Sequence, residues 1–322
     1  MQPLSELLAP IADDMKSVDA VIRQRLDSDV VLIRTIGDYI VGSGGKRLRP
    51  VLVLLAAKAC GYQGTQHALM GAIVEFIHTA TLLHDDVVDE SDLRRGRSTA
   101  NAVFGNPASV LVGDYLYSRA FEMMVDIDRM LIMKTMAEAT TVIAEGEVLQ
   151  LLNVHDPDVT EERYLRVVRF KTAKLFEAAA RCGAILSDVS DEQCDALATY
   201  GRHLGTAFQL IDDLLDYSGD VQTIGKNVGD DLREGKPTLP LLRVLAVGNE
   251  EQKALIRSAI ENGSGDFEGV AKAIRQTDAL EHTQLAAQRE IELAISALEV
   301  VPAGPWRDLL ASIATVSVSR DH

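Results

Sequence analysis

The sequence predicts an all-α protein, a single large bundle of about ten or more helices. Hydrophobic residues make up 47% of the chain but aromatic residues only 5%, a composition typical of a core built from packed helices. Apolar residues recur at three- and four-residue intervals through most of the 322 residues. No segment shows the alternating pattern of a strand, and no short-period repeat is present. We therefore expect one helical domain over residues 1–322.

Glycine, proline and polar runs divide the chain into its expected helices. Two or three amphipathic helices fit residues 3–41, and a glycine-rich break follows at 42–45. Pro50 fits the start of the next helix, because the first turn leaves its amides unbonded and proline has none. The later helices are expected at 50–60, 66–89, 108–125, 130–152, 161–186 and 191–217, and from 239 to the end with breaks near 262–266 and 302–305.

The overall charge and the cysteines exclude several kinds of partner and site. A net charge of −16 and a pI near 4.9 argue against nucleic acid or an anionic membrane surface as the main partner. The three cysteines have no metal-binding spacing and are expected to be reduced core thiols. No apolar run is long enough to span a membrane and no signal-peptide pattern is present, so we expect a cytoplasmic location.

Two acidic motifs share one spacing. They contain Asp85, Asp86 and Asp89 in the first, and Asp212, Asp213 and Asp216 in the second. Positions i, i+1 and i+4 of a helix lie close together, so these carboxylates repel one another unless a cation is bound among them. Mg²⁺ that also contacts a phosphate fits carboxylate oxygens at this spacing. A solvated acidic helix face would explain one such motif, but not its recurrence in a still more apolar helix.

Basic residues near both motifs predict two phosphate sites. Lys46 and Arg49 precede a helix whose free amides also attract phosphate, although a solvated basic turn is the alternative. His78 lies about two turns before the first motif and on a similar face, although it can also be an ordinary core or surface histidine. Directly after the same motif come two arginines that can reach bound phosphate, Arg94 and Arg95.

The stretch 223–238 contains three glycines and two lysines, Lys226 and Lys236. Long irregular loops in compact domains usually carry function. We expect this loop to be a lid that closes its lysines over bound phosphate.

Some polar residues stand in otherwise apolar helices. Lys171 and Thr172 are costly in a buried helix unless an anion or dipole matches them, and Glu147 lies among Leu, Ile, Met and Ala residues. No Ser or Cys nucleophile with a paired His is apparent, and no zinc pattern is present. The groups that remain favour metal-promoted loss of a diphosphate.

Four motifs occur in the order and spacing of a known family, at residues 44–50, 83–96, 208–216 and 229–236. The chain resembles the trans-isoprenyl diphosphate synthases, most closely the bacterial long-chain type that makes octaprenyl diphosphate, and the likeness covers nearly the whole sequence. The resemblance implies an all-α fold around a central cavity. It also implies a homodimer and Mg²⁺-dependent condensation of isopentenyl diphosphate onto an allylic diphosphate, which we expect to be farnesyl diphosphate.

The resemblance further implies a role for each motif residue. Mg²⁺ would be bound by Asp85, Asp89 and Asp212, with supporting roles for Asp86, Asp213 and Asp216. The allylic diphosphate would be held by Arg94, Lys171, Lys226 and Lys236, and isopentenyl diphosphate by Lys46, Arg49, His78 and Arg95. The developing allylic cation would be stabilised by the dipoles of Thr172 and Gln209.

The residues upstream of the first motif predict a long product. Ala80 and Thr81 are small, whereas short-chain members of the family block this level with aromatic side chains. We expect a hepta- to decaprenyl product, with octaprenyl diphosphate the single best prediction, destined for quinone side chains and passed to membrane enzymes. The floor of the cavity is expected among Met123, Met124, Met133 and Met136, although ordinary core packing is the alternative.

Three other functions are alternatives to this one. A terpene cyclase of the same fold needs only one such acidic motif and no isopentenyl site. A regulatory subunit of a heteromeric synthase would lose motif carboxylates, whereas all six are present here. A geranylgeranyl-type synthase would differ only in making a shorter product.

Overall fold

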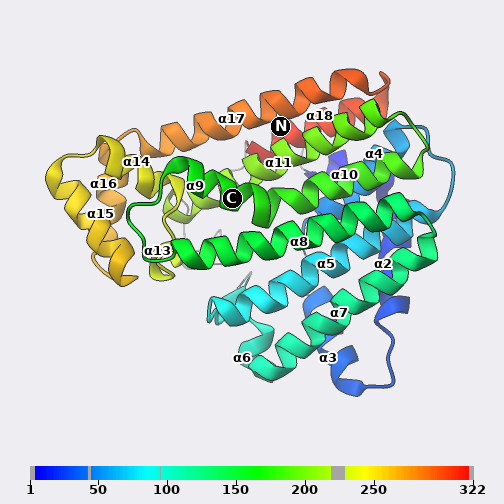
Figure 1. Ribbon diagram of the computed structural model, residues 1–322, viewed down its shortest axis with the longest axis horizontal. Helices are drawn as coiled ribbons and strands as arrows, with labels where there is room; N and C mark the ends of the chain where they lie inside the picture. Colours follow the sequence, from blue (N-terminus) through cyan, green and yellow to red (C-terminus); the bar gives the residue numbers. More distant parts are fainter. Residues whose placement is uncertain (1–3, 43–44, 95, 219–228, 319–322) are drawn as a thin grey trace. The chain divides into compact units, whose positions relative to one another are not determined.

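The computed structural model describes residues 4–42, 45–94, 96–218 and 229–318, and helices account for nearly all of its regular structure (Figure 1). The prediction of an all-α fold is confirmed. Contacts between residues divide the chain into two compact units, each assembled from three segments. The first contains Met1–Thr140, Leu175–Gly201 and Ala297–Ile313, and the second Thr141–Lys174, Arg202–Ser296 and Ala314–His322. The expectation of a single domain stays a prediction.

The first unit is built around helix α5 (Gln66–Val88), which packs against α2, α4 and α7. Its inward face is apolar at positions such as Ile73, Phe76 and Ile77, which are fully or almost fully buried. The other elements that lie wholly in this unit are α1 (Leu4–Leu7), η1 (Ala9–Ile11), α2 (Ala12–Leu26), α3 (Val31–Val41), α4 (Leu48–Ala59), β1 (Leu93–Arg94), β2 (Arg97–Ser98), α6 (Ala100–Phe104), α7 (Asn106–Ile127) and η3 (Leu298–Val300). The first acidic motif thus lies at the end of the unit's central helix.

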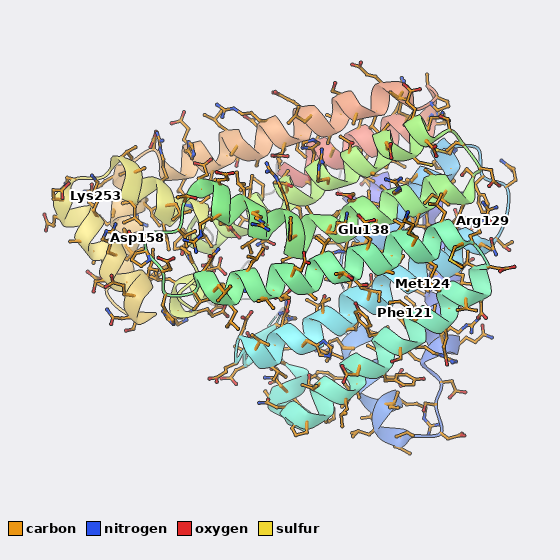
Figure 2. The ribbon with its side chains drawn as sticks, in the orientation of Figure 1. Phe121, Met124, Arg129, Glu138, Asp158 and Lys253 are labelled. Atoms are coloured by element: carbon orange, nitrogen blue, oxygen red, sulfur yellow. The ribbon has the colours of Figure 1, made fainter. Side chains whose placement is uncertain are left out.

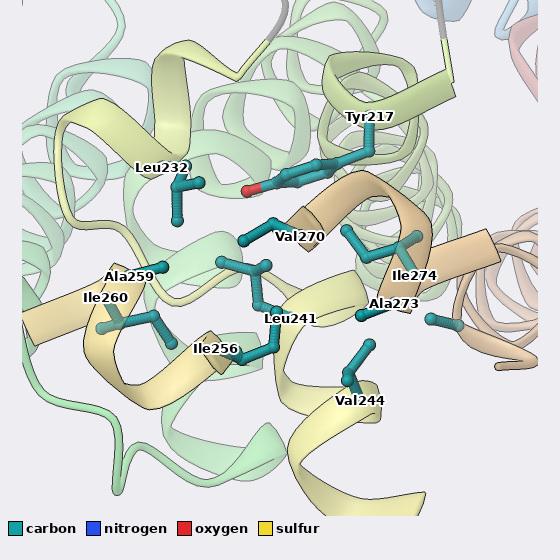
Figure 3. Packing of buried hydrophobic residues seen from close by; sticks show 11 residues of the cluster. Tyr217, Leu232, Leu241, Val244, Ile256, Ala259, Ile260, Val270, Ala273 and Ile274 are labelled. Carbon is teal, nitrogen blue, oxygen red and sulfur yellow. The ribbon is translucent and has the colours of Figure 1, made fainter. Parts of the chain in front are cut away.

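The second unit contains a group of shorter helices. Those wholly within it are α9 (Glu161–Val167), the π-helix η2 (Val168–Ala173), α13 (Asp230–Arg233), α14 (Leu239–Val247), α15 (Glu250–Asn262) and α16 (Phe267–Gln276). Figure 3 shows Tyr217, near the end of α11, lying with Leu232 of α13 against buried aliphatic residues of α14, α15 and α16. This core holds the end of the second acidic helix beside the described part of the predicted lid.

Five longer helices contain a boundary between the units. They are α8 (Met130–Asn153), α10 (Lys174–Leu186), α11 (Asp191–Ser218), α17 (Ala279–Ala297) and α18 (Pro305–Val318). Among the residues that the structure describes, no helix is both long enough and apolar enough to cross a bilayer.

The structure corrects three details of the sequence-based assignment. Residues expected to contain no strand form a two-residue antiparallel hairpin, in which Leu93 pairs with Ser98 and Arg94 with Arg97. Helix α4 begins at Leu48 rather than at Pro50. The helix expected over 161–186 is interrupted by the π-helix at Val168–Ala173. Local hydrophobic periodicity does not reveal such interruptions, because a single extra residue in one turn barely changes the pattern.

Candidate active site

The first acidic motif contains one buried carboxylate and two more accessible ones. Asp86 is only 1% exposed, whereas Asp85 and Asp89 are partly exposed. All three stand at the C-terminal end of α5, where the helix dipole is negative and each carboxylate is disfavoured by about 0.3–1 kcal/mol. The local field therefore adds to the repulsion among the carboxylates and favours a bound cation.

The negative charge of Asp86 is balanced by an ion pair with Arg94. Arg94, on strand β1, places Nε at 2.8 Å and Nη2 at 2.6 Å from the same oxygen, Oδ1 of Asp86. Burial raises the pKa of Asp86 above its ordinary value, and the charge of Arg94 offsets only part of this effect. Burial also lowers the pKa of Arg94, but the neighbouring carboxylates outweigh it and leave that pKa raised. The hairpin thus places the positive charge of Arg94 beside Asp86, the buried aspartate of the motif. Asp85 and Asp89 are the two more accessible aspartates.

Arg49, in the first turn of α4, contacts the middle of α5. Nη1 of Arg49 lies 3.1 Å from Nε2 of His78, and the guanidinium stacks 4.4 Å from the ring centroid of Phe176. A guanidinium can only donate, so Nε2 of His78 is the acceptor in this contact. Lys46 is exposed just before the helix. The structure therefore joins Arg49 and His78, which the sequence analysis placed in one isopentenyl site.

The second acidic motif also has a buried middle aspartate, but it contains two buried carboxylates and one exposed one. Asp212 is exposed, whereas Asp213 and Asp216 are 2% and 8% exposed. The motif lies in the last two turns of α11, again at the negative end of a helix dipole. Oδ2 of Asp216 accepts from the amide of Asp231 at 3.3 Å, and its carbonyl accepts from the amide of Gly229 at 3.1 Å. Asp216 therefore holds the segment that leads into α13.

Asp213 is the end of a chain of hydrogen bonds. Its Oδ1 accepts from Nε2 of Gln209 at 2.7 Å, and Oε1 of Gln209 accepts from the hydroxyl of Thr172 at 3.0 Å. Its Oδ2 accepts from the hydroxyl of Tyr164. Burial raises the pKa of Asp213 well above its ordinary value, the charge of Asp231 adds to this, and the bonds from Tyr164 and Gln209 act in the opposite direction. The two residues expected to stabilise the cation, Thr172 and Gln209, are thus bonded to each other.

Lys171 lies in the π-helix and forms an ion pair with Glu147 of α8, with Nζ 2.6 Å from Oε2. A π-turn shifts the side chains that follow it and is often found at functional sites. The backbones approach closely here, because a Cβ on Gly146 would lie 2.5 Å from the amide nitrogen of Lys171. Gly146 therefore permits the contact that places Lys171 beside Glu147.

We expect Gly146→Ala to disturb this contact. The added methyl group must push the π-helix away, which costs about 1–3 kcal/mol and exceeds the helix propensity that alanine gains. Thermal unfolding should show lower stability, and prenyl-transfer assays a lower kcat. Gly304→Ala is the matched control, because no atom lies within 4 Å of the Cβ position there. Equal stability and activity for the two variants would show that the close approach is unimportant.

The described part of the predicted lid is held by its own residues, by Asp216 and by His155, whose amide donates to the carbonyl of Gly235 at 2.9 Å. Lys236 forms an ion pair with Glu234, and its amide donates to the carbonyl of Asp231 at 2.8 Å. Two predicted phosphate ligands, Arg95 and Lys226, lie outside the described residues, as does the start of the loop at 219–228. The lid therefore stays a prediction.

The residues predicted to control product length belong to the first unit, and most of them are buried. Ala80 of α5 and Met136 of α8 are fully buried, and Met124 of α7, labelled in Figure 2, is 1% exposed. Thr81 is partly exposed and its hydroxyl donates to the carbonyl of His78 at 2.8 Å. These positions fit either the wall of a product cavity or an ordinary core, so their role stays a prediction.

The metal prediction can be tested against the donors present. Carboxylate oxygens are the ligands that Mg²⁺ prefers, and the three predicted ligands, Asp85, Asp89 and Asp212, are the accessible members of their motifs. The chemistry of these donors therefore fits the ion. In the part of the chain that the structure describes, no three acidic, histidine or cysteine side chains are gathered as a metal site. Metal binding by these aspartates stays a prediction.

One surface hollow is lined by none of these residues. It has a volume of about 410 Å³ and is lined by Leu245, Glu250, Lys253, Ala254 and Arg257, and Lys253 is labelled in Figure 2. Its two cations are already matched, Lys253 by Glu250 at 3.3 Å and Arg257 by Asp158 at 2.7 Å. The hollow therefore lacks an evident binding role.

Sequence reasoning missed Tyr164 and Gly146. Both act over long separations in the chain, Tyr164 on Asp213 and Gly146 on Lys171. A tyrosine or glycine in a helix is too common to be a signal. Glu147 was visible as a charge among apolar residues, but only the structure identifies its partner.

Known proteins provide an independent comparison. A sequence model of the family described as polyprenyl synthetase matches residues 30–277. The chain is 55% identical over 324 residues to the octaprenyl diphosphate synthase of Escherichia coli (strain K12), a match that covers 100% of this chain and 99% of that protein.

Solved structures agree with the sequence comparison. The polyprenyl synthase of Caulobacter crescentus CB15, complexed with calcium and isoprenyl diphosphate, has a TM-score of 0.96 and 42% identity, covering 99% of this chain and 98% of that one. A decaprenyl diphosphate synthase from Rhodobacter capsulatus has a TM-score of 0.93 and 45% identity, covering 99% and 100%. The chain therefore belongs to the polyprenyl synthetase family.

Proposed function

We propose that this protein is a long-chain trans-polyprenyl diphosphate synthase, a prenyltransferase that adds isopentenyl diphosphate repeatedly to an allylic diphosphate. One observation carries the proposal. Both acidic motifs stand at negative helix ends, and in each the middle aspartate is buried and hydrogen-bonded while Asp85, Asp89 and Asp212 keep more accessible carboxylates. The similarity to octaprenyl diphosphate synthases along the whole chain supports the same reaction.

We infer that Asp85, Asp89 and Asp212 hold Mg²⁺ that contacts the allylic diphosphate. When bound, the metal neutralises the diphosphate and makes it a better leaving group. Arg94 uses Nε and Nη2 on Asp86, which leaves three of its five N–H donors for phosphate oxygens. Lys171, Lys226 and Lys236 would add further positive charge to the same diphosphate.

Isopentenyl diphosphate is assigned to the residues around the start of α4. The guanidinium of Arg49 stays charged at all accessible pH values and lies beside His78, so these two residues would bind the diphosphate together. Lys46 and Arg95 would complete this site. The hydroxyl of Thr172 and the amide of Gln209 would face the allylic carbon and stabilise its charge as the diphosphate leaves.

Product analysis tests the proposal directly. The purified protein, incubated with Mg²⁺, farnesyl diphosphate and radiolabelled isopentenyl diphosphate, should yield a ladder of linear products that ends near octaprenyl diphosphate. Addition of EDTA should stop elongation and excess Mg²⁺ should restore it. A complete lack of elongation would exclude the synthase, cyclic hydrocarbon would indicate a cyclase, and a ladder ending at geranylgeranyl diphosphate would indicate the shorter-chain type.

The cellular setting follows from the same proposal. We infer a homodimer, a cytoplasmic location and a product that is passed to membrane enzymes for quinone side chains. Light scattering of the purified protein tests the dimer, and the quinone tail length in a complemented deletion strain tests the end use. The regulatory-subunit alternative predicts that elongation appears only when a second, different chain is added.

A further inference from the structure

Tyr164 is a buried polar residue to which the sequence analysis assigned no role. It lies on α9, is 7% exposed, and donates its hydroxyl hydrogen to Oδ2 of Asp213 on α11. The two residues are 49 positions apart, and both belong to the second unit. Asp213 is the middle aspartate of its motif and is not among the predicted metal ligands.

The bond from Tyr164 is the first of three that point in one direction. Gln209 lies one helical turn before Asp213, and its Nε2 donates to Oδ1 of that carboxylate at 2.7 Å. The other end of the amide, Oε1, accepts from the hydroxyl of Thr172 at 3.0 Å. Tyr164 and Gln209 therefore donate to Asp213 directly, and Thr172 donates to Gln209, so all three hydrogen bonds run towards Asp213.

The orientation of the Gln209 amide determines whether the Thr172 hydroxyl presents its hydrogen or its oxygen lone pairs to another partner. Asp213 accepts at both oxygens, from Tyr164 at Oδ2 and from the NH₂ end of the Gln209 amide at Oδ1, so the carbonyl end of that amide faces Thr172. The hydroxyl hydrogen of Thr172 is then used on Gln209, and the lone pairs of its oxygen remain for another partner. A carbocation is stabilised by lone pairs and repelled by a hydroxyl hydrogen, so the order suits an allylic cation.

We propose that Tyr164 is a positioning residue for prenyl transfer, which acts through Asp213 and Gln209 to keep the oxygen lone pairs of Thr172 turned towards the reacting carbon. The inference rests on the proposed function. Without the bond from Tyr164, the carboxylate of Asp213 is free to rotate and the amide of Gln209 can reverse. Thr172 would then lose its acceptor and could present its hydroxyl hydrogen instead.

The first test is Tyr164→Phe, which removes one hydroxyl and keeps the ring. We expect kcat for elongation to fall about tenfold, less than the roughly 100-fold or greater loss when a group that touches the developing charge is removed. The KM values for both diphosphates should stay the same. Tyr200→Phe is the matched control, because Tyr200 is another buried tyrosine whose hydroxyl donates to a backbone carbonyl, that of Leu310, at 2.8 Å.

A double-mutant cycle separates positioning from a purely structural role. In a Thr172→Val background there is no hydroxyl left to orient, so Tyr164→Phe should cause no further fall in kcat, whereas its effect on Tm should be the same in both backgrounds. In a Thr172→Ser background the fall in kcat should return. An equal fall in kcat with and without the Thr172 hydroxyl would overturn the proposal, as would a Tyr164→Phe enzyme with unchanged kcat.

A second variant covers the case in which Tyr164→Phe does not fold. Asp213→Asn keeps the size of the side chain but gives it one donor and one acceptor end, so it can meet Gln209 in either orientation and no longer holds the Gln209 amide in one order. It should lower kcat in the native background and not in the Thr172→Val background, and additive effects would again overturn the proposal. Failure of the wild-type protein to elongate would instead contradict the proposed function itself, so the two failures are distinguishable.

Discussion

Asp85→Asn is expected to lower the elongation rate by about three orders of magnitude, because the proposed metal site would lose a charged ligand and with it several kcal/mol of stabilisation of the departing diphosphate. Asp86 cannot replace it, since that carboxylate is buried and bonded to Arg94. The Mg²⁺ concentration needed for half-maximal activity should rise as well. Steady-state elongation assays across a Mg²⁺ titration measure both effects.

Two comparison variants make this result specific. Asp92→Asn changes an exposed carboxylate a few residues further on and should leave the Mg²⁺ requirement unchanged. Asp86→Asn should instead lower Tm, because it leaves the charge of Arg94 without its partner in a buried site. Full activity of Asp85→Asn at ordinary Mg²⁺ concentration would exclude Asp85 as a metal ligand.

Ala80→Tyr is expected to convert the enzyme to a short-chain synthase. Ala80 precedes Asp85 by five positions (85 − 80), so it lies about 7.5 Å further along the helix axis, where the growing chain is expected to pass. A tyrosine ring at this level should stop growth at about three or four isoprene units. Chromatographic sizing of the dephosphorylated products measures the change.

Burial at this position makes the experiment discriminating. Ala80 is fully buried, so a tyrosine either enters a product cavity or overpacks the core of the first unit. A shorter product with nearly unchanged Tm indicates the cavity, and an unchanged product with a lower Tm contradicts the chain-length role. Ala80→Ser keeps the side chain small and should leave the product length as it is.

Much of the fold was predictable because helices are local. The periodicity of apolar residues and the glycine and proline breaks located α5, α7, α8 and α11 to within about two residues at each end, the usual uncertainty of helix ends. The π-helix at Val168–Ala173 and the hairpin at 93–98 were not predicted. Both are short, and neither leaves a periodic pattern long enough to recognise.

The candidate site was predictable as a set of residues but not as a set of contacts. Spacing alone made Asp85, Asp86 and Asp89 equivalent, whereas the structure buries Asp86 and pairs it with Arg94. The sequence predicted that Arg49 and His78 belong to one binding site, but not that the two side chains contact each other. Spacing along a helix specifies a face, but burial depends on which neighbouring elements cover that face.

The sequence by itself determined the helical class, the doubled acidic motif and the family, because each depends on residue type and short-range spacing. Tertiary structure alone decided which aspartates are buried and that Tyr164, Asp213, Gln209 and Thr172 form one hydrogen-bonded chain. The reason is physical. The direction of a hydrogen bond depends on which donors and acceptors meet in space, and residues 49 positions apart meet only after the helices have packed.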